Sequence, residues 1–133
     1  MRFRTFFILF SILSLSSCIT SADQQPQANK ILQQLNQSIQ KHQWEQAEAL
    51  FDPKFFKQMP KKYWEQQMKA QIEEKGEIQA FNLVSQQKDP RFGGDFYIYV
   101  MSVVHEHGTS HETVTIIKPI DDKPMTISGF LFK

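Results

Sequence analysis

Residues 95–106 read DFYIYVMSVVHE, and this stretch decides the fold of the 133-residue chain. Its β-branched and aromatic residues alternate with a period of two, which is typical of a β-strand. One face would carry Phe96, Ile98, Val100, Ser102 and Val104, and the other Tyr97, Tyr99, Met101, Val103 and His105. Both faces are apolar. A sheet covered by helices on one side would therefore leave the second set exposed, unless the sheet curls or another chain covers it.

Three more strands are predicted around this one. They cover residues 77–86, 112–118 and 125–132, where β-branched and aromatic residues again dominate. A loop is expected over 88–94, which contains Pro90 and two glycines, and tighter turns near Gly108 and over 121–124. Connections this short favour an antiparallel meander.

The residues before Gly76 have a helical period instead. The first helix is indicated by Ile31, Leu32, Leu35 and Ile39. A second, short helix is expected over 44–51, with Asp52-Pro53 as its stop, and a third from Pro60 to Gly76. The sequence therefore predicts an α+β domain in which three N-terminal helices pack on one face of a curled, four-stranded antiparallel sheet.

The first residues resemble a bacterial lipoprotein signal. Arg2 and Arg4 precede an apolar run that ends in Leu15-Ser16-Ser17-Cys18, the pattern of a lipobox. The resemblance implies a signal peptide over 1–17, and a diacylglyceryl group and further acyl chains such as palmitate on Cys18. The polar composition of residues 19–28, with no apolar period, predicts a flexible tether after Cys18, and the remaining length predicts one folded domain over 29–133. An ordinary secretory signal with an incidental cysteine is the alternative.

Acylated Cys18 would bind the lipid bilayer. By resemblance to enterobacterial lipoproteins, Ile19 after the cysteine favours the outer membrane, with the domain facing the periplasm. Cys18 is the only cysteine, so a lipidated chain keeps no thiol for disulfides, metal binding or catalysis. The chain has 15 Lys and Arg against 14 Asp and Glu, and loss of the leader removes two arginines. This near-neutral balance indicates no nucleic-acid partner, and no cofactor is predicted.

The order of helices and strands resembles the superfamily named for nuclear transport factor 2, a cone of three helices and a curled sheet. Within it, the chain is similar to small secreted or lipid-anchored bacterial domains of unknown function. The likeness is carried by packing positions: Trp44, Ala47, Leu50, Phe51, Phe55, Phe56, Trp64, Gly76, Phe96 to Val104, Glu112 to Ile116, and Ile127 to Phe130. Some enzymes of this superfamily hold an Asp, or an Asp and a His, inside the cone. Here residues 96–104 and 114–117 contain no carboxylate, which counts against that chemistry.

The one cluster of metal-ligating residue types is His105, His107, His111 and Glu112 around Gly108. A turn centred on Gly108 and Thr109 would set His105 opposite Glu112, and Glu106 opposite His111. The two imidazoles and two carboxylates of these pairs could hold zinc or a similar cation, but the two pairs would project to opposite faces, so one compact site would need a twisted or bulged hairpin. Cross-strand charge pairs at an exposed hairpin tip are the simpler interpretation.

Five residues are candidates for a ligand site, because aromatic rings with polar tips suit amphipathic molecules: Tyr63, Trp64, Tyr97, Tyr99 and Met101. The same residues could simply complete the core. The leading hypothesis is a non-catalytic lipoprotein that binds a protein partner or a small apolar ligand, with a homodimer through the sheet as one way to cover its apolar face. The alternatives are a hydrolase or isomerase that uses His105 or His111 as base, and a metal-binding lipoprotein.

Overall fold

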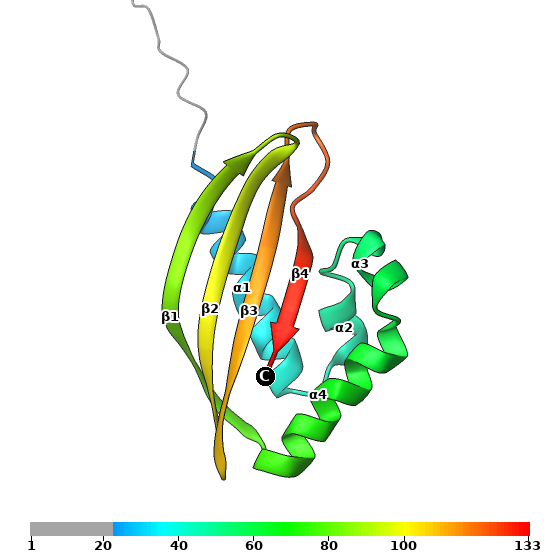
Figure 1. Ribbon diagram of the computed structural model, residues 1–133, viewed down its shortest axis with the longest axis vertical. Coiled ribbons are helices and arrows are strands. Elements are labelled where there is room, and N and C mark those ends of the chain that lie inside the picture. Colours follow the sequence, from blue (N-terminus) through cyan, green and yellow to red (C-terminus); the bar gives the residue numbers. More distant parts are fainter. Residues whose placement is uncertain (1–22) are drawn as a thin grey trace, which may run out of the picture.

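The computed structural model describes residues 23–133 as helices followed by one sheet (Figure 1). The helices are α1 (Gln25–Gln40), α2 (Trp44–Glu48), α3 (Pro53–Gln58) and α4 (Lys61–Lys75). The strands are β1 (Ile78–Arg91), β2 (Gly94–His105), β3 (Gly108–Pro119) and β4 (Thr126–Phe132). All neighbours in the order β1-β2-β3-β4 are antiparallel, so the predicted α+β class and four-stranded meander are confirmed. The signal, the lipobox and Cys18 lie outside the described residues.

The described residues form four helices, where the sequence predicts three. The additional helix is α3, and it begins at the two residues interpreted as a stop. Asp52 has an extended backbone and its Oδ1 accepts a hydrogen bond of 2.8 Å from the N–H of Lys54, while Pro53 occupies the first turn. Asp before Pro ends one helix and also caps the next, because proline lacks only an N–H that the first turn leaves unpaired.

Helix α1 begins at Gln25, earlier than the apolar period indicates, with Pro26 in its first turn. Ala28 on this turn is fully buried. Residues 25–28 therefore belong to α1 and not to the predicted tether. Among the described residues, no helix is both long and apolar enough to cross a membrane.

Strand β1 is longer than predicted and replaces the expected loop over 88–94. It continues through Pro90 to Arg91 and turns back at Phe92 and Gly93. Proline is tolerated there because β1 is an edge strand, on which a missing N–H need not break the ladder. Strand β3 is also longer than the expected 112–118.

The β2–β3 hairpin has a different register from the predicted one. His105 pairs with Gly108, so Met101 faces Glu112 and Ser102 faces His111. The turn is Glu106-His107 because the helix before β1 holds it: the N–H of His107 donates to the carbonyl of Lys75 at 2.8 Å. The predicted turn at Gly108 and Thr109 is wrong in position, although it places the correct residues on each face.

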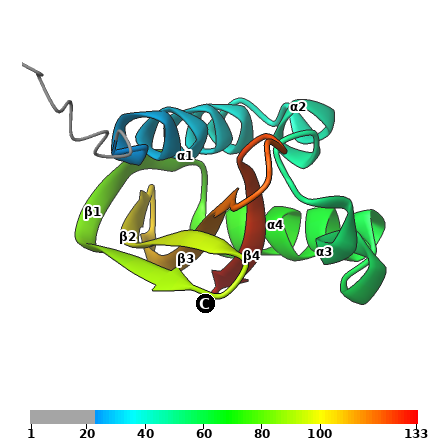
Figure 2. The same cartoon turned by 90° about the horizontal axis from the view of Figure 1, so that it is seen from above.

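The core lies between the helices and the inner face of the sheet (Figure 2). Viewed from above, the sheet bends around α1, and α3 and α4 lie beyond β4. The residues of β2 on this face are all buried: Tyr97, Tyr99, Met101, Val103 and His105. The helices thus cover the second set of β2 residues, whereas the first set on the outer face is only half-buried.

Candidate functional site

An apolar groove runs between α4 and the edge of β4. It has a volume of about 170 Å³ and is lined by Met59, Tyr63, Trp64, Gln67, Phe130, Leu131 and Phe132. A larger hollow of about 470 Å³ lies between α1 and α2, but its lining is mainly glutamine and other polar residues. The groove is the better candidate, because binding sites are concave and mostly apolar with a few polar groups.

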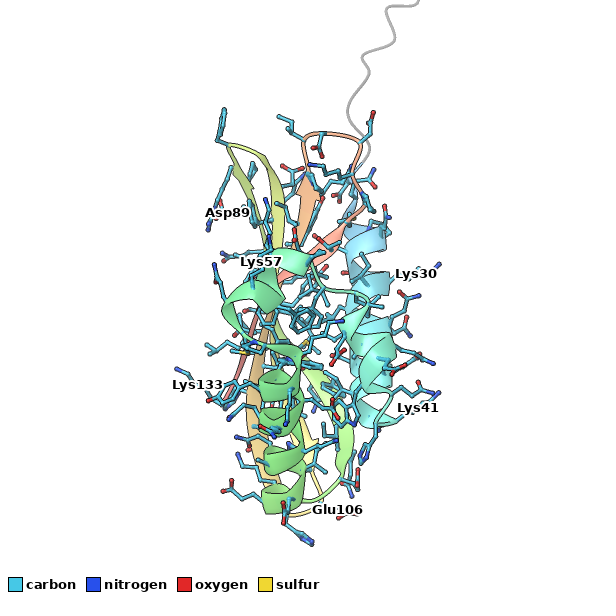
Figure 3. The ribbon with its side chains drawn as sticks, turned by 90° about the vertical axis from the view of Figure 1, so that its right-hand side faces the viewer. Lys30, Lys41, Lys57, Asp89, Glu106 and Lys133 are labelled. Atoms are coloured by element: carbon cyan, nitrogen blue, oxygen red, sulfur yellow. The ribbon has the colours of Figure 1, made fainter. Side chains whose placement is uncertain are left out.

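Stacked and edge-on aromatic rings form the wall of the groove. The rings of Phe130 and Phe132 are parallel with centroids 6.1 Å apart, and the Trp64 ring meets Phe130 edge-on at 5.6 Å. Trp64 is buried, whereas Tyr63 and Leu131 are each about half exposed and form the rim. Figure 3 looks onto the α3 and α4 side of the molecule, with Lys133 at the end of β4. The groove therefore has an aromatic floor and an accessible rim.

The backbone of β4 adds polar groups to this groove. His111 and Lys133 exchange two hydrogen bonds of 2.8 and 2.9 Å, so they form a hydrogen-bonded pair of the β3–β4 ladder. Such pairs alternate along an antiparallel ladder. The N–H and C=O groups of Phe132 and Phe130 therefore point away from β3, toward the free edge.

The start of the same edge is already occupied by the chain itself. The N–H of Ile127 donates to the carbonyl of Leu50, and the N–H of Asp52 donates to the carbonyl of Ile127, at 2.9 and 2.8 Å. These bonds make a short parallel bridge between Phe51 and Ile127. The segment between α2 and α3 thus behaves as a short fifth strand, and beyond it the edge at Phe130 and Phe132 faces the groove.

A buried carboxyl lies behind this wall. Glu112 is fully buried and faces Met101 on β2 and Phe132 on β4, which share its side of the sheet. Within residues 23–133, neither carboxyl oxygen has a hydrogen-bond partner. Burial among apolar side chains raises the pKa of Glu112 from 4.5 to about 8, because the charged form loses its hydration. At neutral pH this carboxyl is mainly protonated.

The structure separates the four candidate metal ligands. His105 and Glu112 lie on the inner face, His111 is exposed on the outer face, and His107 is exposed in the turn. The described residues contain no group of three or more His, Cys, Asp or Glu that could hold a metal ion. The hairpin cluster is therefore not assembled as one site.

Both ring nitrogens of His105 make hydrogen bonds within the fold. Its Nδ1–H donates to the carbonyl of Gly76 at 2.9 Å, since a carbonyl can only accept. Its Nε2 is 2.8 Å from the Ser110 hydroxyl. Both ring nitrogens thus join the α4–β1 junction to the hairpin, which leaves neither nitrogen for a substrate in this arrangement.

The five predicted ligand residues divide into two groups. Tyr63 and Trp64 line the groove, while Tyr97, Tyr99 and Met101 belong to the core. The Tyr99 hydroxyl accepts a hydrogen bond from Nε2 of Gln25 at 2.6 Å and donates one to Oδ1 of Asn29 at 2.7 Å. Burial is the main cause that raises the pKa of Tyr99 to about 12. Its polar tip thus holds α1 on the sheet.

Sequence reasoning missed two parts of the site. Phe130 and Phe132 alternate on one face at the end of the last predicted strand, which indicated a core strand but not that its edge is free. Glu112 is recognisable in the sequence only as a candidate metal ligand at the hairpin, because it lies two residues before Val114 and so outside the carboxylate-free stretch 114–117. The correction is that the inner face of the sheet does carry a carboxyl.

Comparisons with known proteins identify no relative. No protein-family description matches the chain, and neither curated proteins nor solved structures give a match.

Proposed function

We propose that this protein is a non-catalytic, lipid-anchored binding protein of the periplasmic face of the outer membrane, held by acylated Cys18. Its binding site is the α4–β4 groove, and its ligand is an extended, apolar segment of a partner protein. We also propose a nuclear transport factor 2-like cone for the domain. Helices that precede a bent antiparallel meander and pack against its inner face support that assignment.

The observation that carries the proposal is the free edge of β4 beside an apolar groove. Backbone groups of Phe130 and Phe132 point out of the sheet, and the rim residues Tyr63 and Leu131 expose apolar surface next to them. A peptide strand added at such an edge gains main-chain hydrogen bonds, while pockets for alternate side chains select its sequence. The residues from Leu50 to Asp52 already use this geometry on the first part of the edge.

Binding is favoured over catalysis by the state of the titratable groups near the groove. Glu112 is fully buried and is not among the residues that line the groove. Its cross-strand neighbour Phe132 lines the groove instead. His105 uses both ring nitrogens within the fold. A catalytic acid or base must come within hydrogen-bond distance of the substrate, and both groups would have to move to do so.

The test begins with a photo-reactive amino acid in place of Tyr63 or Leu131 in the full chain, in cells. The control carries it at Lys30, which is exposed on α1. We expect both groove positions to cross-link one common segment of a partner and Lys30 not to do so. The cross-linked segment is then synthesised as a peptide for binding measurements.

The main-chain contribution is measured with Phe132→Ala and Phe132→Pro. Both variants lose the phenyl ring of Phe132. Only the proline variant also loses the backbone N–H of residue 132, which points outward and is not part of the β3–β4 ladder. One net hydrogen bond is worth about 0.5–1.5 kcal/mol, so the proline variant should bind the peptide roughly 2- to 10-fold more weakly than the alanine variant. Equal affinities would contradict strand addition. A small molecule found bound to the protein by native mass spectrometry would contradict the peptide as the ligand of the groove. A homodimer in sedimentation, joined by two β4 edges, would contradict it as well.

A further inference from the structure

Two large apolar side chains project from one end of the domain and are mostly or fully exposed. Phe92 is 109 % exposed in the β1–β2 turn, and Ile120 is 85 % exposed in the β3–β4 connection. Both connections lie at the upper end of the molecule in Figure 1. The N–H of Ile120 donates to the carbonyl of Gly93 at 3.0 Å, so the two loops are joined side by side. Together they form the apolar tip, defined as Phe92 and Ile120.

The turn itself does not require an aromatic residue. Gly93, with φ at +105°, supplies the conformation that other residues rarely adopt, and no atom beyond its two chain neighbours lies within 4 Å of where its Cβ would be. The Phe92 side chain therefore contributes exposed apolar surface without contributing to the core. Single exposed apolar residues are common, but two on joined loops at one end form a local apolar contact point.

The charges around the tip neutralise one another. Nζ of Lys88 is 3.0 Å from the Asp95 carboxylate, and Nζ of Lys123 is 3.0 Å from that of Asp121. The surrounding surface therefore carries charges of both signs rather than a patch of one sign. This arrangement suits a surface that accepts apolar side chains, and it offers little to a strongly charged partner.

The start of the described chain lies close to the same end. Gln25 in the first turn of α1 contacts the hydroxyl of Tyr99 on β2. From Tyr99 to Gly94, where β2 begins at the tip, the strand rises by about 17 Å at about 3.4 Å per residue. Asp23 lies five positions after Cys18, and five extended residues span at most about 18 Å. A lipid on Cys18 can thus reach the level of the tip but cannot carry the domain far from the bilayer.

We propose that the apolar tip inserts into the headgroup region of the bilayer that holds Cys18, and so fixes the orientation of the domain. This inference rests on the lipid anchor proposed above. The acyl chains on Cys18 would hold the protein at the bilayer, and the tip at the same end of the domain would add a second contact that limits how the domain turns about its anchor. The β2–β3 turn, marked by Glu106 in Figure 3, then lies at the end farthest from the lipid.

The experiment uses the full chain, produced with its anchor in a bacterial host and added to vesicles of phosphatidylethanolamine and phosphatidylglycerol. Phe92→Cys and Ile120→Cys each place an environment-sensitive fluorophore on the tip. His107→Cys is the matched control, because His107 is an exposed turn residue at the opposite end. Iodide in the water measures how far each fluorophore is shielded. Intact-mass measurement of the unsubstituted chain reports whether Cys18 is acylated.

We expect vesicles to shift the emission at positions 92 and 120 to shorter wavelength and to protect both from iodide, with no change at position 107. With the fluorophore at 120, Phe92→Asp should abolish the shift while leaving the circular dichroism spectrum unchanged. Equal quenching at 92 and 107 would overturn the tip proposal. An unacylated Cys18 would instead overturn the anchor. The difference between positions 92 and 107 still tests the tip in that case, because a fluorophore on Cys18 contributes equally to both variants.

Discussion

Replacing the buried Glu112 with glutamine should change how the stability of the protein depends on pH. Glu112 is fully buried between Met101 and Phe132, and burial raises its pKa from 4.5 to about 8. Glutamine has nearly the same shape and remains neutral at every pH. The Glu112→Gln variant therefore removes the ionisation while leaving a buried polar group in place.

The sign follows from proton binding. Between pH 4.5 and pH 8 the unfolded chain has released the proton of Glu112 and the folded chain still holds it. The contribution of protonated Glu112 to the free energy of unfolding is therefore fully present below pH 4.5 and is lost as pH rises toward 8. At about 1.4 kcal/mol for each pH unit, the loss over this window is on the order of 5 kcal/mol. Since small domains are stable by only about 5–15 kcal/mol, the effect is large.

The assay is urea unfolding of the soluble chain from Ile19 onward, followed by tryptophan fluorescence at several pH values from 4.5 to 8. We expect the wild type to lose stability across this range relative to Glu112→Gln, with the two closest at pH 4.5. Glu73→Gln, an exposed glutamate on α4, is the control and should follow the wild type. A difference between wild type and Glu112→Gln that stays constant with pH would refute the burial of an uncharged carboxyl.

Two further substitutions test how the fold holds the site. Tyr99→Phe removes the hydroxyl that joins Gln25 and Asn29 to the sheet, so we expect a loss of about 0.5–1.5 kcal/mol and faster amide hydrogen exchange in the first turn of α1. Unchanged exchange there would show that this hydroxyl does not hold the helix. Gly94→Ala should cost about 2 kcal/mol or more in urea unfolding, because φ is +154° and the new Cβ would lie 2.2 Å from the carbonyl oxygen of Lys118. Gly129→Ala is the matched control, with its Cβ 3.3 Å from Thr115, and similar losses in both variants would contradict the strain at Gly94.

Local patterns in the sequence are sufficient for the class of fold. The alternation in residues 95–106 predicts both faces of β2, and the structure buries the alternate residues from Tyr97 to His105 as one face. The 3.6-residue period predicts α1 and α4 for the same reason, because a buried stripe must repeat with the geometry of its element. Tyr63 and Trp64 of the groove are also recognisable, as aromatic residues on a predicted helix.

Some local sequence patterns are compatible with two structures, and only contacts with other elements of the fold decide between them. Asp52-Pro53 is equally a helix stop and a helix cap, and it became a cap because Asp52 and Leu50 also bond to β4. The position of the β2–β3 turn depends on the carbonyl of Lys75, which accepts from His107. Neither contact is visible in the local sequence, since each joins residues that are far apart along the chain.

The sequence by itself determined the class of fold, the order of every element except α3, and the alternation of residues on the two faces of β2, since these follow from side-chain periodicity within single elements. Only the tertiary structure decided that Glu112 lacks a partner, that Phe130 and Phe132 turn their backbone toward a groove, and that Phe92 and Ile120 share one tip. Each of these depends on what lies across a strand pair or beside an edge. Hydration, burial and hydrogen bonding at such places are set by residues brought together from separate parts of the chain.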